Sequence, residues 1–195
     1  ELQPLCRASA GRATDPDPVC VRFLGVLGDR AGCSLLRDSI ARPELAADAI
    51  AALGAAGWTE NVPLLIDLMS DDTLGPDAVL AYRRITGADD VEGHLPIPRV
   101  EPPDGEDARE ALPPDPAKAS ADWEARCADL DEDVALQDGR PLDASRLPAH
   151  FQDLPLRTRA DVYLRVKNAP DGAPPDIELE ASARAQMAGA TSSGS

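Results

Sequence analysis

The stretch FLGVLGDRAGCSLL (residues 23–36) is followed by ALGAAGWTENVPLL (residues 52–65), and the two segments share the same spacing of glycines and leucines. Every matching pair is offset by 29 residues. A constant offset across two residue types indicates an internal repeat, and repeats of about 20–50 residues are typical of stacked supersecondary units. The matching pairs are Gly25 with Gly54, Gly28 with Gly57, Leu35 with Leu64, and Leu36 with Leu65.

Each unit carries the local signals of two helices joined by a turn. Pro43 and Pro63 stand where the first turn of a helix tolerates a missing amide hydrogen. Gly57 and Gly87 stand where helices would end, because glycine readily adopts the left-handed conformation found there. Apolar residues recur at helical spacing between these signals. The expected helices are residues 31–40, 43–57, 61–69 and 75–87.

One such hairpin cannot bury its own apolar face, because both of its helices are amphipathic, so it needs a neighbour on which to stack. We therefore predict an all-α fold in which residues 1–87 form an α-solenoid of helical hairpins. A partial further copy, DPVCVRFLGVLG (residues 17–28), stands at the front of the series. The half unit suggests that more repeats precede Glu1 in the intact protein.

The units resemble HEAT-like repeats of the short bacterial kind, which also occur in phycobilisome lyases. The resemblance covers residues 17–87 and rests on ALGAAG, on NVPLL, and on the Asp-Ala-x-x-Ala opening of each second helix. A second resemblance follows the order YRRITG, acidic spacer, DPAKASADWEARC, GRPL and ELEASARAQ. This order is similar to that of an uncharacterised bacterial HEAT-repeat family often encoded near type VI secretion genes. The resemblance implies a context and no catalytic residues.

After residue 87 the composition changes. Residues 88–116 hold seven prolines and nine acidic residues against two basic ones, so we predict an extended acidic, proline-rich spacer over residues 88–115. We expect residues 116–188 to form a small C-terminal helical region that packs on the repeats. In it, Asp115 would cap a helix, Trp123 would dock that helix, and Asp138-Gly139 would form a hairpin or a simple turn. Residues 189–195 are expected to be a disordered tail.

The charge of the chain restricts its partners. The net charge is −16, from 35 acidic and 19 basic residues, with no basic stripe, so we expect neither nucleic acid nor an anionic membrane as a partner. A basic protein partner is compatible with this charge. The four scattered cysteines, the lack of a signal peptide and the lack of a long apolar run favour a cytoplasmic protein with free thiols.

Residue patterns that support chemistry are missing from the sequence. His94 and His150 are isolated, and a zinc site needs three or four converging ligands. Asp129, Asp131 and Asp133 alternate like an EF-hand loop, but Val134 and Arg140 replace the glycine and the glutamate that calcium binding requires. There is no phosphate-binding glycine loop or nucleophile elbow. We therefore expect no catalytic residues, no metal and no cofactor.

Four residues are candidates for partner binding: Trp58, Tyr82, Arg83 and Arg84. Trp58 follows Gly57 at the turn between helices, where it would be either an exposed interface anchor or a residue packed over the next hairpin. Arg83 and Arg84 would either bind an acidic peptide or offset the dipole of the helix that ends there, and their position favours the dipole. Tyr82 precedes them on the same helix.

The functional prediction is a non-enzymatic protein–protein interaction module. The secretion-linked resemblance implies a basic secreted effector or its carrier as the partner, with this chain as adaptor, chaperone or immunity factor. The alternative is a lyase-like HEAT enzyme or a small-ligand binder. That alternative requires a deep pocket with a perturbed acid, histidine or thiol.

Overall fold

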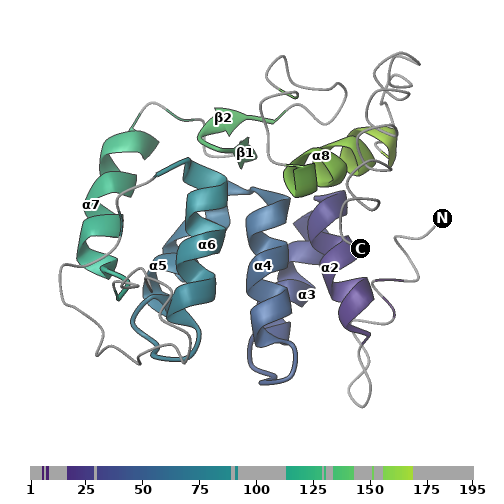
Figure 1. Cartoon of the computed structure of the whole chain (residues 1–195), viewed down its shortest axis with the longest axis horizontal. Helices are drawn as coiled ribbons and strands as arrows, with labels where there is room; N and C mark the ends of the chain where they lie inside the picture. The colour runs from purple at the N-terminus through teal and green to yellow at the C-terminus, as the bar shows by residue number, and fades with distance from the viewer. Residues whose placement is uncertain are drawn as a thin grey trace, which may run out of the picture.

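The protein is mostly helical, as expected from its sequence. A computed structural model describes residues 6, 8, 17–28, 30–88, 91, 113–128, 130, 134–142, 151 and 156–168. These residues include seven α-helices packed together and one two-stranded antiparallel sheet (Figure 1). The elements are α2 (Pro18–Leu27), α3 (Arg30–Ser39), α4 (Ala46–Ala56), the 3-10 turn η1 (Thr59–Asn61), α5 (Val62–Leu68), α6 (Gly75–Thr86), α7 (Pro116–Cys127), β1 (Leu136–Gln137), β2 (Arg140–Pro141) and α8 (Leu156–Asn168).

The helices between residues 18 and 86 form two layers. Helices α2, α4 and α6 lie side by side, with α4 in the middle and in contact with both of the others (Figure 1). Helices α3 and α5 lie behind them, with α3 packed on α2 and α4 and α5 packed on α6. The chain therefore alternates between the layers, and each return to the front layer adds one helix beside the previous one.

Two predicted helix stops agree with the structure, and one predicted helix start does not. Gly57 and Gly87 end α4 and α6 with φ values of 75° and 68°, which confirms the two predicted stops. The predicted start of α4 at Pro43 is wrong, because the helix begins at Ala46. The preceding residues form turns, in which Leu45 N–H donates to Arg42 O at 2.9 Å and the Leu45 side chain is buried. Burying Leu45 therefore places the chain in a turn before the helix starts.

The front layer is held together by two equivalent close approaches. A Cβ atom added to Gly25 of α2 would lie 2.5 Å from Ala52 Cα of α4. One added to Gly54 of α4 would lie 2.8 Å from Ala81 Cα of α6. Gly25 and Gly54 are 29 residues apart, as are Ala52 and Ala81. The two contacts therefore join residues at the same spacing, and each requires glycine because the backbones nearly touch.

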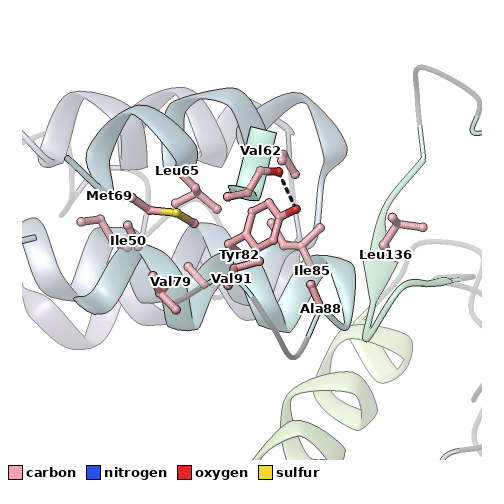
Figure 2. Packing of buried hydrophobic residues seen from close by; sticks show 13 residues of the cluster. Ile50, Val62, Leu65, Met69, Val79, Tyr82, Ile85, Ala88, Val91 and Leu136 are labelled. Atoms are coloured by element: carbon pink, nitrogen blue, oxygen red, sulfur yellow. Dashed lines mark hydrogen bonds between the residues drawn. The ribbon is translucent and has the colours of Figure 1, made fainter. Parts of the chain in front are cut away.

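The described residues form three hydrophobic clusters, and α4 contributes to the two larger ones. Ala49 and Leu53 pack with residues of α2 and α3 in one cluster, and Ile50 packs in the other. Figure 2 shows the second cluster, where Ile50 lies near Leu65 of α5 and near Met69, which directly follows α5. Because α4 is covered on several sides, eight of its eleven residues are buried, and most of these are alanine, glycine or leucine.

Later segments of the chain cap the ends of the front helices. The predicted turn at Asp138-Gly139 is a hairpin between β1 and β2, with φ of 50° and 73° at these two residues. Asp138 and Gly139 donate their amide hydrogens to Arg84 O and Ile85 O, each at 2.9 Å. The hairpin thereby satisfies carbonyls in the last turn of α6 that have no partner within the helix.

Helix α7 agrees with its prediction. The Asp115 side chain caps it by accepting from Lys118 N at 3.0 Å, and Trp123 packs against the cluster of Figure 2. Most of the predicted spacer and the whole predicted tail lie outside the described residues.

The close approach at Gly54 generates the first prediction. Gly54→Ala should lower the free energy of unfolding by about 2 kcal/mol, because the added methyl group forces α4 and α6 apart. This loss would outweigh the gain in helix propensity that alanine normally brings. The free energy of unfolding is measured by chemical denaturation of the full chain, with circular dichroism as the probe.

The matched control is Ala47→Leu, which adds bulk to an exposed position of the same helix. It should change the free energy of unfolding by no more than about 0.5 kcal/mol. A Gly54→Ala chain as stable as the wild type would contradict the required contact between α4 and α6.

Candidate functional site

An open groove runs over the layer formed by α2, α4 and α6, and it has a volume of about 410 Å³. Each of the three helices presents one face to it, and α8 closes one end. The lining residues are Val19, Arg22, Phe23 and Val26 of α2, Ala51, Ala52 and Ala55 of α4, Asp77, Leu80, Ala81 and Arg84 of α6, and Asp161 and Leu164 of α8.

The floor of the groove is made by alanines and its walls by longer side chains. Ala51, Ala52 and Ala55 belong to the middle helix, so the surface is lowest along α4. Val19 and Leu80 stand on opposite walls with 58% and 63% of their surface exposed, and they are the large hydrophobic side chains that stand out as exposed among the described residues. A contiguous apolar surface of this kind marks a binding site more often than scattered exposed leucines do.

The charged groups of the groove are paired, with one exception. Arg22 Nη2 lies 2.7 Å from Asp48 Oδ1 on the outer side, and Arg84 Nη2 lies 2.6 Å from Asp161 Oδ2 at the α8 end. Asp77, which is half-buried in the first turn of α6, has no ion-pair or hydrogen-bond partner among the described residues. The uncompensated charge of the groove is therefore negative and lies at the end away from α8.

A buried arginine fixes the helix that closes the groove. Arg165 of α8 is 5% exposed, and its Nη1 donates to Ala56 O at the C-terminal end of α4 at a distance of 2.6 Å. A cation at this end of a helix is stabilised by the helix dipole. Burial lowers the pKa of Arg165 to about 10, so its guanidinium stays protonated at neutral pH. It also fills the space beside Gly28, where a Cβ would meet the guanidinium.

Trp58 takes part in the same junction. Its side chain is half-buried and packs against the cluster formed by α2, α3 and α4. Its indole Nε1 donates to Gly28 O at 2.8 Å, and the guanidinium carbons of Arg30 and Arg165 lie 4.5 Å and 5.7 Å from the ring centre. The Trp58 side chain therefore packs in this junction, while part of it stays exposed to solvent.

The other three candidates for partner binding, Tyr82, Arg83 and Arg84, each lie in a different environment. Tyr82 is fully buried (Figure 2). Its hydroxyl lies 2.7 Å from Asp122 Oδ2 and 3.0 Å from Ala119 O of α7. Burial and the Asp122 carboxylate raise the pKa of Tyr82. Arg83 Nε donates to Ala88 O beyond the end of α6. Arg84 alone of the four candidates lines the groove.

The groove residues that the sequence reasoning missed have a detectable spacing. Positions 19, 22, 23 and 26 of α2 and positions 77, 80, 81 and 84 of α6 both follow the i, i+3, i+4, i+7 pattern of one helix face. On α2 these positions include the apolar Val19, Phe23 and Val26, whereas on α6 Leu80 lies between the charged Asp77 and Arg84. On α2, a set of apolar residues separate from the buried Val21 and Leu24 would have indicated the groove.

The two buried thiols, Cys6 and Cys33, are unsuited to nucleophilic chemistry. Burial and the neighbouring Cys20 thiol raise the pKa of Cys6 to about 11, and burial also raises the pKa of Cys33. A reactive cysteine needs the opposite change, because the thiolate is the nucleophile. The described residues contain no group of three or more histidine, cysteine, aspartate or glutamate side chains that could hold a metal ion. His94 and His150 lie outside them.

Within the described part of the chain, no helix has both the length and the apolar character needed to cross a bilayer. Comparisons with models of known protein families, with curated proteins and with solved structures found no match. The resemblance to HEAT-like repeats therefore stays a prediction, and the site has to be interpreted from its own geometry.

The junction at Arg165 generates the second prediction. Arg165→Met should lower the free energy of unfolding by about 2–3 kcal/mol, because it removes a buried charge-assisted hydrogen bond and leaves Ala56 O without that donor. Hydrogen exchange should also become faster in α8, which Arg165 ties to α4. Both quantities can be measured on the full chain.

The control is Lys167→Met, which removes a positive charge from an exposed position of the same helix. It should have a much smaller effect on both quantities. Equal effects of the two substitutions would mean that net charge, and not the contact with Ala56, stabilises α8.

Proposed function

We propose that the chain is a non-enzymatic docking module that binds another protein through the groove over α4. The observation that carries the proposal is the groove itself, an apolar surface with Val19 and Leu80 exposed on its walls and an alanine floor between them. Exposing these side chains to water is unfavourable, and a partner that covers them would gain the corresponding free energy.

The architecture proposed for this module is a short solenoid. Its support is the repeated contact of Gly25 with Ala52 and of Gly54 with Ala81, together with the alternation of the chain between two layers. In a solenoid, equivalent helices line up and create one extended surface for binding. On this interpretation, the groove is built from equivalent positions of successive repeats.

The proposed partner is a protein with a basic surface. The support is the net charge of −16 and the uncompensated carboxylate of Asp77 in the groove. The resemblance to a secretion-linked family extends the proposal to a basic type VI effector or its carrier, with this chain acting as adaptor, chaperone or immunity factor in the cytoplasm.

The alternative is a small-ligand binder or a lyase-like enzyme. The volume of the groove falls within the range of about 300–1,000 Å³ that is usual for ligand pockets. Among the described residues, however, its lining includes neither a histidine nor a thiol, and two of its larger apolar side chains are exposed to solvent. These features favour a protein partner over a reacting small molecule.

The third prediction tests the docking function. The products of neighbouring genes would be co-expressed with the full chain, and the affinity of any complex would be measured by titration calorimetry. Leu80→Glu and Ala51→Trp should each weaken the complex at least tenfold, because the first places a charge on the wall and the second fills the floor. Neither should change the free energy of unfolding by more than about 1 kcal/mol, because both positions are exposed.

Ala121→Trp serves as the control, since it makes the same substitution at an exposed alanine of α7, outside the groove. It should leave the affinity unchanged. A complex that tolerates Leu80→Glu and Ala51→Trp would show that the partner binds elsewhere and would refute the groove as the docking site.

A further inference from the structure

We propose that the occupant of the groove is a short amphipathic helix that lies along α4 and places a lysine or arginine against Asp77. This inference rests on the proposed docking function and adds the shape, charge and direction of the bound segment. It follows from the dimensions of the groove, from the position of its unpaired charge and from the polarity of the three helices below it.

The shape of the groove fits a helix. Its walls extend from Val19 to Val26 on α2 and from Asp77 to Arg84 on α6, which is two helical turns, or about 10 Å, on each side. The alanines of α4 lie between the walls and leave room for a helix to approach closely, as small residues do at helix–helix contacts. Helices bind such grooves through residues at positions i, i+3 or i+4, and i+7.

The charge of the groove gives the bound helix an orientation. At the α8 end, Arg84 is neutralised by Asp161 and Leu164 adds an apolar side chain, so this end accepts apolar residues. At the opposite end, Asp77 has no partner among the described residues, while Arg22 is already paired with Asp48. A cation of the ligand is therefore best placed beside Asp77.

The position of Asp77 also determines the direction in which the bound helix runs. Asp77 lies in the first turn of α6, and α2, α4 and α6 run parallel in the front layer (Figure 1). A ligand helix antiparallel to them would bring its C-terminal turn to Asp77. A lysine or arginine there would interact favourably both with Asp77 and with the dipole of its own helix.

A second copy of this chain is a poorer occupant. Each chain carries a net charge of −16, so two copies repel one another unless their charges are screened. A basic amphipathic helix from another protein is attracted by the same charge. The proposal therefore commits to a heterologous partner segment.

The test uses designed peptides and the full-length chain. The first probe is a lactam-stapled helical peptide of about 15 residues, with leucines at i, i+4 and i+7 and a lysine in the last turn. The second probe carries glutamate in place of that lysine. The third has the lysine moved to the first turn. Binding is measured by fluorescence anisotropy at low and at high salt.

The first peptide should bind about fivefold more tightly than the glutamate peptide, which is the effect of one ion pair at a half-buried site. It should also bind more tightly than the peptide with the lysine in its first turn. High salt should reduce these preferences, because the interaction is electrostatic. In the chain with Asp77→Lys, the order of the lysine and glutamate peptides should reverse.

Matched variants separate this inference from the docking function. Asp67→Lys makes the same charge change at an exposed position of α5, and it should leave the preference intact. Ala51→Trp should abolish binding of all three peptides, whereas Ala121→Trp should not. If the natural partner depends on Leu80 and Ala51 while Asp77→Lys leaves the peptide preference unchanged, the docking function holds and this inference fails.

Two other results would overturn the proposal. One is the failure of the lysine peptide to bind the wild-type chain at about millimolar concentration. The other is self-association in sedimentation velocity that Leu80→Glu abolishes, because the groove would then be an interface between two copies of this chain.

Discussion

The structure depends on how closely α2, α4 and α6 approach one another. At Gly25 and at Gly54 the backbone of one helix meets an alanine of the next, Ala52 and Ala81, with no room for a side chain between them. This contact sets the spacing of the front layer. It also explains the composition of α4, whose small residues let it be covered on several sides while Ala51 stays exposed on the groove floor. The groove exists because small residues stand along the middle helix while longer ones stand on its two neighbours.

A second constraint is the need to satisfy the carbonyl groups at the C-terminal ends of these three helices. Each end receives donors from a segment that comes later in the chain: Gly28 O from the indole of Trp58, Ala56 O from Arg165, and Arg84 O from the hairpin. The C-terminal region therefore does more than cover apolar surface. By capping α4, Arg165 also holds α8 across one end of the groove, so the same hydrogen bond that stabilises the fold shapes the site.

Much of the helical layer could be predicted from the sequence because its signals are local. Gly57 and Gly87 mark helix ends, and Asp115 marks a helix start, wherever the rest of the chain lies. The start of α4 was misplaced because Pro43 is an equally good local signal, and only the burial of Leu45 decides against it.

The candidate site could be predicted only in part, because it depends on packing between distant segments. Arg84 was identified, but the pair that it forms with Asp161 joins residues 77 positions apart, and no local pattern indicates it. The burial of Tyr82 likewise depends on α7, which arrives after a long intervening segment. Val19 and Leu80 each lie at helical spacing with other groove residues, yet their place in one groove becomes visible only when α2 and α6 pack on the two sides of α4.

The most direct test of the account is to map where a basic amphipathic helix touches the protein. Backbone amide chemical shifts of the labelled full-length chain would be followed by NMR while the lysine peptide is added. The account predicts that the largest changes fall on the groove faces of α2, α4 and α6 and on α8 near Leu164. Changes centred on α3 and α5 in the back layer, or on α7, would contradict it.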